Sequence, residues 1–358
     1  MKWKKILMAT DFSKSAERGL ESARALAAET GGTIVLLHVV QTPYAIYPQE
    51  MLDVAALSEA WMREARRALM PLAARARRGG RRVTVEVRFG APWRWILDVA
   101  GTLAVDAIVI GASGHSRFER LVLGSTAEKV VRSSPVPVLV THGRALKRIR
   151  RVLAPVDLGE GSSWALRLAG LLGGREASIE ALLVVPRRLG TMPVVPYYPE
   201  APPLPPMEES EAALEQFLEG HSLDRVRGKV VAADDTASGI LDHERAGKVD
   251  LIVVATHGRR GLDRALLGSV AEKVIRHAEA PVLVVPEGQG PKAAASMRED
   301  VARSGTRRKK ASPKERVRPA GRHQRGPWTG QAHTGRGGPA GRRGGSPRAK
   351  PEQPPTER

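Results

Sequence analysis

The chain has 358 residues, a formal net charge of +19 and no cysteine. This length suits two or three domains, and the lack of cysteine excludes disulfides, thiolate metal sites and cysteine nucleophiles. Aromatic residues make up 4% of the sequence and apolar residues 42%, so the cores must be aliphatic. No run approaches the ~18 apolar residues that a membrane span needs, and we expect a soluble, cytoplasmic protein without a membrane partner.

Most of the net charge lies at the C-terminal end. Residues 291–358 contain 18 Lys/Arg and 5 Asp/Glu, a balance of +13, whereas the preceding 290 residues contain 39 basic and 33 acidic side chains, a balance of +6. This segment is rich in Gly, Pro and Arg and shows no period, so it cannot bury enough apolar surface to fold alone. We expect residues 289–358 to form a disordered basic tail.

In the first half of the chain, apolar runs alternate with segments of helical periodicity. Strands are predicted at 4–10, 33–40, 83–89, 106–112 and 136–141. Helices are predicted at 14–30, at about 50–78, from Pro92 onward, and in the GSTAEKV segment that starts at residue 124. Such alternation is typical of a parallel, doubly wound sheet, and the near-continuous apolar strands fit a sheet covered on both faces.

The second half repeats this order. Strands are predicted at 150–157, 179–185, 229–233 and 250–256 and in the closing APVLVV segment, and helices at about 161–172, 207–220 and 238–247 and in the GSVAEKV segment. Residues 186–206 are Pro-rich and should be extended. We expect an α/β protein with two doubly wound, parallel five-stranded sheets, one in domain 1 (1–145) and one in domain 2 (146–288).

A glycine pattern occurs in both halves, 144 residues apart. The first copy reads Gly111-Ala-Ser-Gly114, nine residues, then Gly124-Ser125, and the second reads Ala255-Thr-His-Gly258, nine residues, then Gly268-Ser269. The stretches at 124–140 and 268–284 match at 11 of 17 positions. Each copy follows an apolar run and opens a helical run, where backbone N–H groups can bind a phosphate.

Asp11 and Asp157 end the first predicted strand of each half. If the fourth strand lies beside the first, each aspartate meets its glycine loop in the crevice where the strand order reverses. A carboxylate there can accept a hydrogen bond from a ribose hydroxyl. Arg120 and Arg264 precede the second glycine element of each copy and could neutralise phosphate charge.

A purely structural interpretation of the same residues stays open. Ser125 and Ser269 each begin an S-x-x-E sequence that fits a helix capping box. In that interpretation the glycines are turn residues and the two aspartates cap the helices that follow them.

Several catalytic patterns are missing from the sequence. The glycine pattern is neither a GxxxxGK[ST] loop nor a GxGxxG fingerprint, and no HExxH or G-x-S-x-G motif occurs. Nucleotide hydrolysis needs a positioned water, a metal and charge stabilisation, and no dedicated base is evident. We therefore expect no catalytic residue and no protein metal site, and at most weak ATPase activity.

The two strand-end aspartates, the LLHVV segment, the G-x2-G-x9-G-[ST] pattern and the AEKV helix together resemble the universal stress protein family in a tandem two-domain form. The resemblance covers residues 3–142 and 149–286. It implies the five-stranded, adenine nucleotide alpha hydrolase-like fold. In one branch of the family it implies binding of ATP or AMP, with or without Mg²⁺.

The resemblance also implies residue roles. In the first half, Asp11 would bind the ribose, the backbone of Val39 the adenine, Gly111 would lie against the ribose, and Gly114, Gly124 and Ser125 would hold the phosphates. The second site would use Asp157, Val184, Gly258, Gly268 and Ser269. Ala255 departs from the glycine expected at its position.

Two functional hypotheses follow. The first is an adenine nucleotide binding module that acts in stress response or signalling. The second is a nucleic-acid or protein-partner scaffold that works through the basic tail, including the RRKK sequence at 307–310, with structural glycine loops. The family also implies antiparallel pairing of the last strands, either within one chain as a pseudo-dimer or between chains as a homodimer.

Overall fold

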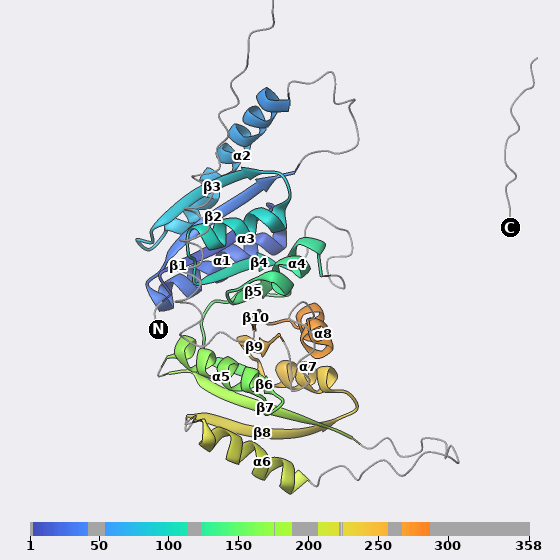
Figure 1. The fold of residues 1–358 in the computed structure, drawn as a ribbon. Coiled ribbons are helices and arrows are strands. Elements are labelled where there is room, and N and C mark those ends of the chain that lie inside the picture. The colour runs from blue at the N-terminus through green and yellow to red at the C-terminus, as the bar shows by residue number, and fades with distance from the viewer. Residues whose placement is uncertain are drawn as a thin grey trace, which may run out of the picture. The chain divides into compact units, whose positions relative to one another are not determined.

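The described part of the chain alternates strands and helices in the order that the apolar periodicity predicts (Figure 1). The structure, a computed structural model, describes residues 3–41, 54–112, 123–174, 176–187, 207–221, 223, 225–256 and 267–286. The predicted disordered tail at 289–358 lies outside these residues, as does most of the predicted Pro-rich loop at 186–206.

The first half contains β1 (Lys5–Thr10), α1 (Lys14–Thr30), β2 (Thr33–Val40), α2 (Val54–Arg77), β3 (Val83–Phe89), α3 (Pro92–Thr102), β4 (Ala107–Gly111), α4 (Ser125–Ser133) and β5 (Val138–Thr141). Local signals set the ends of α1. The Ser13 side chain accepts a hydrogen bond from the Ala16 N–H at the N-cap, and Gly31 ends the helix with a φ of 72°. Glycine adopts this left-handed conformation readily, so the Gly31-Gly32 pair predicted this helix end correctly.

The second half contains β6 (Arg151–Val156), α5 (Glu160–Gly173), β7 (Ser178–Pro186), α6 (Met207–Gly220), β8 (Val226–Ala233), α7 (Thr236–Gly247), β9 (Leu251–Ala255), α8 (Ser269–His277) and β10 (Val282–Val285). Strand β8 begins at Val226, before the predicted start at 229. The three residues before that start, Val226–Gly228, include an arginine and a glycine, which weaken the apolar pattern, but their backbone pairs in register with β7.

The strands form one continuous sheet, in which the two predicted five-stranded parallel sets are joined through their last strands. Ten strands follow the order β3-β2-β1-β4-β5-β10-β9-β6-β7-β8. The five strands of each half are parallel to one another, and β5 pairs antiparallel with β10, with Leu139 opposite Leu283. All four residues of each of these two strands are buried. Pairing removes two apolar edges from water at once, which explains why the sheets merge.

The linker between the halves is bonded to both of them. The Arg144 N–H donates to the Glu279 carbonyl at 3.0 Å, in the second half. Two residues later, the Leu146 N–H donates to the Ser22 hydroxyl at 2.9 Å, in the first half. On the other face, Arg132 of α4 lies 3.7 Å from Glu272 of α8. The contacts between halves therefore extend beyond the β5–β10 pair.

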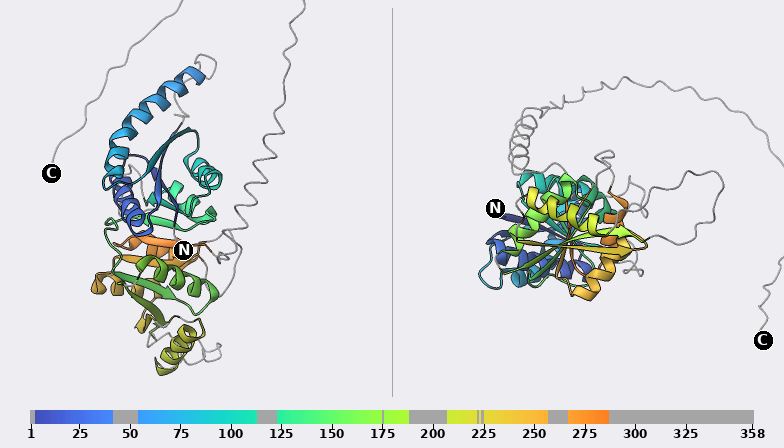
Figure 2. Two further views of the ribbon diagram at one scale, coloured as in Figure 1. Left: turned by 90° about the vertical axis from the view of Figure 1, so that its left-hand side faces the viewer. Right: turned by 90° about the horizontal axis from the view of Figure 1, so that it is seen from below.

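Two aliphatic cores cover the two faces of the sheet. One packs α1, α2, α5 and α6 against the strands through residues such as Leu20 and Leu69, and the other packs α3, α4, α7 and α8 through residues such as Val130 and Val274. Figure 2 shows the same division for the first half, with α1 and α2 on one side of its strands and α3 and α4 on the other. In both halves the strand order reverses between the first and fourth strands, as predicted. This leaves a crevice at the carboxyl ends of the strands.

Candidate functional site

A cavity of about 600 Å³ lies at the carboxyl ends of β1, β2 and β4, beside the first turn of α4. Its lining residues come from five chain segments: Ala9–Asp11, Leu37–Gln41, Pro92 with Ile96, Ile110–Ala112, and Leu123–Ala127. Five of the six residues predicted for the first site lie on its wall, namely Asp11, Val39, Gly111, Gly124 and Ser125. Its volume is within the range of small-molecule sites.

Asp11 lies in a tight turn between β1 and α1. Its Oδ1 accepts a hydrogen bond from the Ser13 N–H at 3.0 Å, and the Thr10 hydroxyl accepts one from the Phe12 N–H at 3.1 Å. Phe12 has a φ of 65°, a left-handed conformation that costs about 1–2 kcal/mol in a non-glycine residue. Because Ser13 is the N-cap of α1, the interpretation of Asp11 as the helix cap is wrong. The aspartate instead organises the turn that leads into the helix.

The first turn of α4 faces the cavity without a capping side chain. Gly124 is the N-cap, and its N–H donates to the Ala112 carbonyl at 2.7 Å. Ser125 is the first helical residue, so the capping-box interpretation is wrong; Glu128 instead pairs with Arg132 at 3.0 Å. Since Ser125, Thr126 and Ala127 all line the cavity, the N–H end of the helix dipole favours a negatively charged group there.

His38 of β2 lines the cavity too. Its ring packs against Phe12 with centroids 4.6 Å apart, and its Nδ1 lies 2.8 Å from the Thr10 carbonyl oxygen. Thr10 and His38 are opposite each other in the β1–β2 register. The register could have identified both residues, but reading it requires the strand pairing and not the sequence alone.

Basic and aromatic side chains gather on α3 and α4. Arg94 and Lys129 lie over the Trp93 ring, 5.2 and 5.7 Å from its centroid. In the second half, the lysine that corresponds to Lys129 is Lys273, which lies 3.7 Å from Asp235, the N-cap of α7. The hydrogen bond from the Ser238 hydroxyl is the largest cause that lowers the pKa of Asp235, and Lys273 adds to it. The corresponding lysines therefore differ in their partners: Lys129 lies over an aromatic ring, whereas Lys273 lies near a carboxylate.

Four of the five residues predicted for the second site lie in the described part of the chain and occupy the corresponding positions. Asp157 follows β6, Val184 lies on β7, and Gly268 and Ser269 begin α8 as N-cap and first helical residue. The Asp157 Oδ1 accepts hydrogen bonds from the Gly159 N–H and the Ser162 hydroxyl, at 3.0 and 2.6 Å. The N-cap of α5 is Gly159, so Asp157 is not the helix cap either.

The remaining predicted positions lie outside the described residues: Gly114, Gly258, Arg120 and Arg264. Within the described ranges, no group of three or more His, Cys, Asp or Glu side chains could hold a metal ion. None of the described helices is both long and apolar enough to cross a membrane.

Comparison with known proteins identifies relatives for both halves. The sequence profile of the Universal stress protein family matches residues 2–142 and again residues 148–286. A universal stress protein of Mycobacterium tuberculosis is 28% identical over 205 residues, which cover 56% of this chain and 68% of that protein. Another, of Mycolicibacterium smegmatis, is 29% identical over 294 residues, covering 78% of this chain and 96% of that protein.

The fold has solved counterparts as well. The crystal structure of a universal stress protein from Archaeoglobus fulgidus is similar, with a TM-score of 0.62 at 20% identity. The match covers 80% of this chain and 100% of that one. At this identity the likeness concerns the fold alone.

Proposed function

Because this chain belongs to the universal stress protein family, we propose that its first half binds an adenine nucleotide, ATP or AMP, in the cavity beside α4. The main support for the proposal is that two suitable groups line the same cavity. A carboxylate that can accept hydrogen bonds, Asp11, and a helix N-terminus that attracts anions, Gly124-Ser125, line one space of about 600 Å³. These are the two groups that a ribose and a phosphate require.

The proposed roles follow the chemistry of each segment. Asp11 binds the ribose hydroxyls, the Val39 backbone contacts the adenine, and Gly111 lies against the ribose. The phosphates, with or without Mg²⁺, bind at Gly124 and Ser125 together with Gly114. No residue of this set is a base placed for hydrolysis, so the site binds nucleotide with no or very slow turnover and serves in stress response or signalling.

The second half is proposed to bind a second nucleotide through Asp157, Val184, Gly258, Gly268 and Ser269. The support is the repeated geometry at the start of α8. The Gly268 N–H donates to the Thr256 carbonyl at 2.9 Å, as the Gly124 N–H does to Ala112 in the first half. A glycine N-cap without a side-chain bond begins both helices.

We also propose that the β5–β10 pair holds the two halves as an intramolecular pseudo-dimer of two domains, 1–145 and 146–288. The antiparallel strand pair, the Arg132–Glu272 ion pair and the doubly bonded linker support this arrangement. A partner chain is then not needed to cover the last strand of either half.

Native mass spectrometry of the freshly purified chain, followed by denaturation to identify what is released, tests the nucleotide proposal. We expect one or two adenine nucleotides per chain. Gly124→Val and Gly268→Val should abolish binding at their own sites, and Gly220→Val is the matched control because nothing lies within 4 Å of a Cβ there. A chain that stays empty with added ATP and Mg²⁺ would overturn the proposal.

The alternative function, nucleic-acid or partner binding through the basic tail, rests on the charge of +13 at 291–358. Deleting these residues separates the two functions. The deletion should leave nucleotide release unchanged but should abolish any RNA or DNA binding that depends on the tail. In the full chain, such binding should weaken steeply as salt is added.

A further inference from the structure

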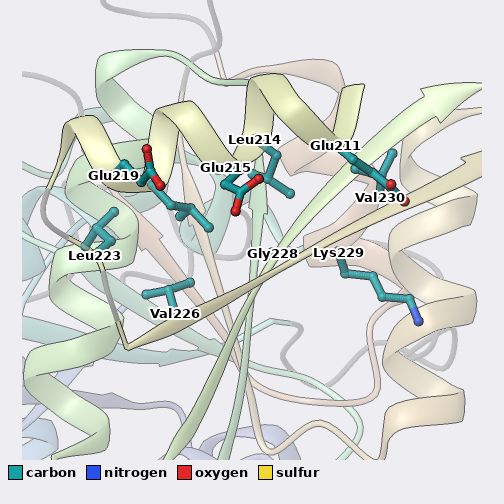
Figure 3. A pocket seen from close by; sticks show the side chains of 10 residues that line it. Glu211, Leu214, Glu215, Glu219, Leu223, Val226, Gly228, Lys229 and Val230 are labelled. Carbon is teal, nitrogen blue, oxygen red and sulfur yellow. The ribbon is translucent and has the colours of Figure 1, made fainter. Parts of the chain in front are cut away.

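A groove of about 740 Å³ separates α6 from β8 at the outer edge of the second half (Figure 3). It is lined by Glu211, Leu214, Glu215, Leu218, Glu219, Leu223, Val226, Gly228, Lys229 and Val230. Leucine and valine side chains form its floor, and the glutamates of α6 stand along its rim. The groove lies on the opposite face of the sheet from the cavity-side helices α7 and α8.

The floor of the groove includes a position where β8 has no side chain and the first half has one. Val226 pairs with Ile179 as Val83 pairs with Ile34, so Gly228 takes the position of Val85. A Cβ on Gly228 would lie 3.1 Å from Leu214 Cδ2 and 3.3 Å from Leu218 Cδ1. Without a valine side chain there, Leu214 and Leu218 of α6 pack directly over Gly228, at the floor of the groove.

The α6 side of the groove is acidic along its whole length, and Lys229 of β8 is the one basic side chain among the lining residues. Helix α6 reads MEESEAALEQFLEG and contains five glutamates and no lysine or arginine. Glu211, Glu215 and Glu219 follow one another at intervals of four residues, and all three line the groove. Like charges at this spacing repel one another and weaken the helix. A cationic segment in the groove would relieve that repulsion.

Strand β8 also offers backbone hydrogen bonds. It is the last strand in the sheet order, so one of its edges has no neighbouring strand in the described sheet. An extended peptide can add to such an edge and place alternate side chains toward the flanking helix.

We propose that this groove docks the chain's own basic segment at residues 303–311. The segment reads RSGTRRKKA, with five basic residues and no acidic one. Alternate side chains of an extended chain are about 6.6 Å apart, and glutamates at i and i+4 on a helix are about 6 Å apart. Arg307 and Lys309 therefore match two consecutive glutamates of the rim in both charge and spacing.

The chain is long enough for this docking. Strand β10 ends at Val285, which leaves 21 residues before Arg307. Four strand spacings separate β10 from β8 in the sheet order, or about 19 Å. A chain of that length spans up to about 70 Å when extended, and intramolecular linkage raises the effective concentration of the segment to the millimolar range. A docked segment is unavailable for contacts with nucleic-acid phosphates.

Carbodiimide cross-linking of the full chain tests the proposal, because this reagent joins a lysine amine directly to a carboxylate that it contacts. We expect Lys309 or Lys310 to be linked to Glu211, Glu215 or Glu219 within one chain. Glu211→Gln with Glu215→Gln should reduce the yield about five-fold, as should high salt. The control, Glu208→Gln with Glu209→Gln, removes the same charge from the same helix outside the groove and should leave the yield unchanged.

Two further measurements show whether the chain's own segment or a second copy occupies the groove. In a mixture of ¹⁴N- and ¹⁵N-labelled chains, links between labelled and unlabelled chains would make a second copy the occupant and overturn the proposal. Replacing residues 307–310 with serine should speed amide hydrogen exchange in β8 about five-fold in the full chain. Equal exchange in both proteins would show that the segment does not cover the strand.

Discussion

Gly111 and Ser15 approach each other so closely that a Cβ on Gly111 would lie 2.6 Å from the Ser15 Oγ. Ser15 is in the first turn of α1, and its hydroxyl donates to the Thr141 carbonyl at 3.0 Å. The strand end, the helix and β5 are therefore fitted together at one point. Gly111 is required there for packing between helix and strand, in addition to any contact with a ligand.

In the second half, the small and the larger residue at this helix–strand position are exchanged. Ala255 stands where the first half has Gly111, and Gly161, by the spacing from Asp157, stands where it has Ser15. Val285 pairs with Ala255 as Thr141 pairs with Gly111. By this correspondence, the half with the larger residue at the strand end has the smaller residue in the helix. We expect this exchange to let the second half depart from the glycine pattern while keeping the fold.

Gly111→Ala should destabilise the chain by about 1–3 kcal/mol, the usual cost of adding volume to a packed site. Combining it with Ser15→Gly and Thr141→Val, which copies the second half, should recover part of that loss. Urea denaturation of the single, double and triple variants measures a coupling energy of about 0.5–3 kcal/mol. If the changes in unfolding free energy of the three substitutions simply added, the proposed coupling between these positions would be contradicted.

Asp11→Ala should lower the affinity of the first site for ATP about 10–100-fold, because hydrogen bonds to a charged group contribute about 1.5–3 kcal/mol. Isothermal titration calorimetry measures the change, and circular dichroism checks that the turn at Ser13 still starts α1. Asp234→Ala, at an exposed aspartate outside the cavity, is the matched control. Equal affinities for the two variants would exclude Asp11 as the ribose ligand.

The sequence predicted the order of elements because the apolar runs and the two repeats are local signals. It also indicated that Asp11 would meet the glycine loop that begins at Gly111 if the fourth strand lay beside the first, and β4 does pair with β1. The contact of Gly111 with Ser15 joins residues far apart in the chain and could not be predicted from spacing. The sequence left two pairings of the last strands open: pairing within one chain, which gives the single sheet, and pairing with a second chain.

Glu244 connects the linker to the second half from a buried position. Its carboxylate accepts hydrogen bonds from the Ala280 N–H at 2.6 Å and the Glu279 N–H at 3.3 Å, and Arg144 lies 3.9 Å away. The side chain is only 1% exposed. Burial raises the pKa of Glu244 above its ordinary value of 4.5, against the opposing effect of these hydrogen bonds and of Arg144.

Because its pKa is raised in the folded chain, Glu244 makes the stability of the chain depend on pH. The folded chain holds this proton where the unfolded chain has lost it, so its contribution to stability is complete below pH 4.5 and declines as the pH rises through the folded pKa. Glu244→Gln cannot ionise and should lack this decline. Urea denaturation of both proteins across this range measures the difference in free energy, and parallel curves would contradict the prediction.

Removing the Glu244 carboxylate altogether should be worse than neutralising it. Glu244→Ala leaves the Ala280 and Glu279 N–H groups without their acceptor and should cost about 2–4 kcal/mol. Glu208→Ala, on the exposed face of α6, should change the unfolding free energy by less than about 0.5 kcal/mol. A similar small effect for both variants would show that water replaces the carboxylate at no cost.

Gly228→Val should fill the groove between α6 and β8 and raise the melting temperature. Valine fits a strand better than glycine by up to about 1 kcal/mol. Its Cβ would lie 3.1 Å from Leu214 Cδ2, 3.2 Å from Leu214 Cγ and 3.3 Å from Leu218 Cδ1, so both leucines must shift slightly to admit it. The same change should reduce cross-linking of Lys309 and Lys310 to the α6 glutamates, because the apolar floor is no longer open.

Gly170→Val is the control, since the nearest atom to its Cβ is Ile179 Cδ1 at 3.8 Å and it lies in a helix away from the groove. If Gly228→Val raised the melting temperature but left the cross-links intact, the segment would be held by the acidic rim and the strand edge and not by the groove floor.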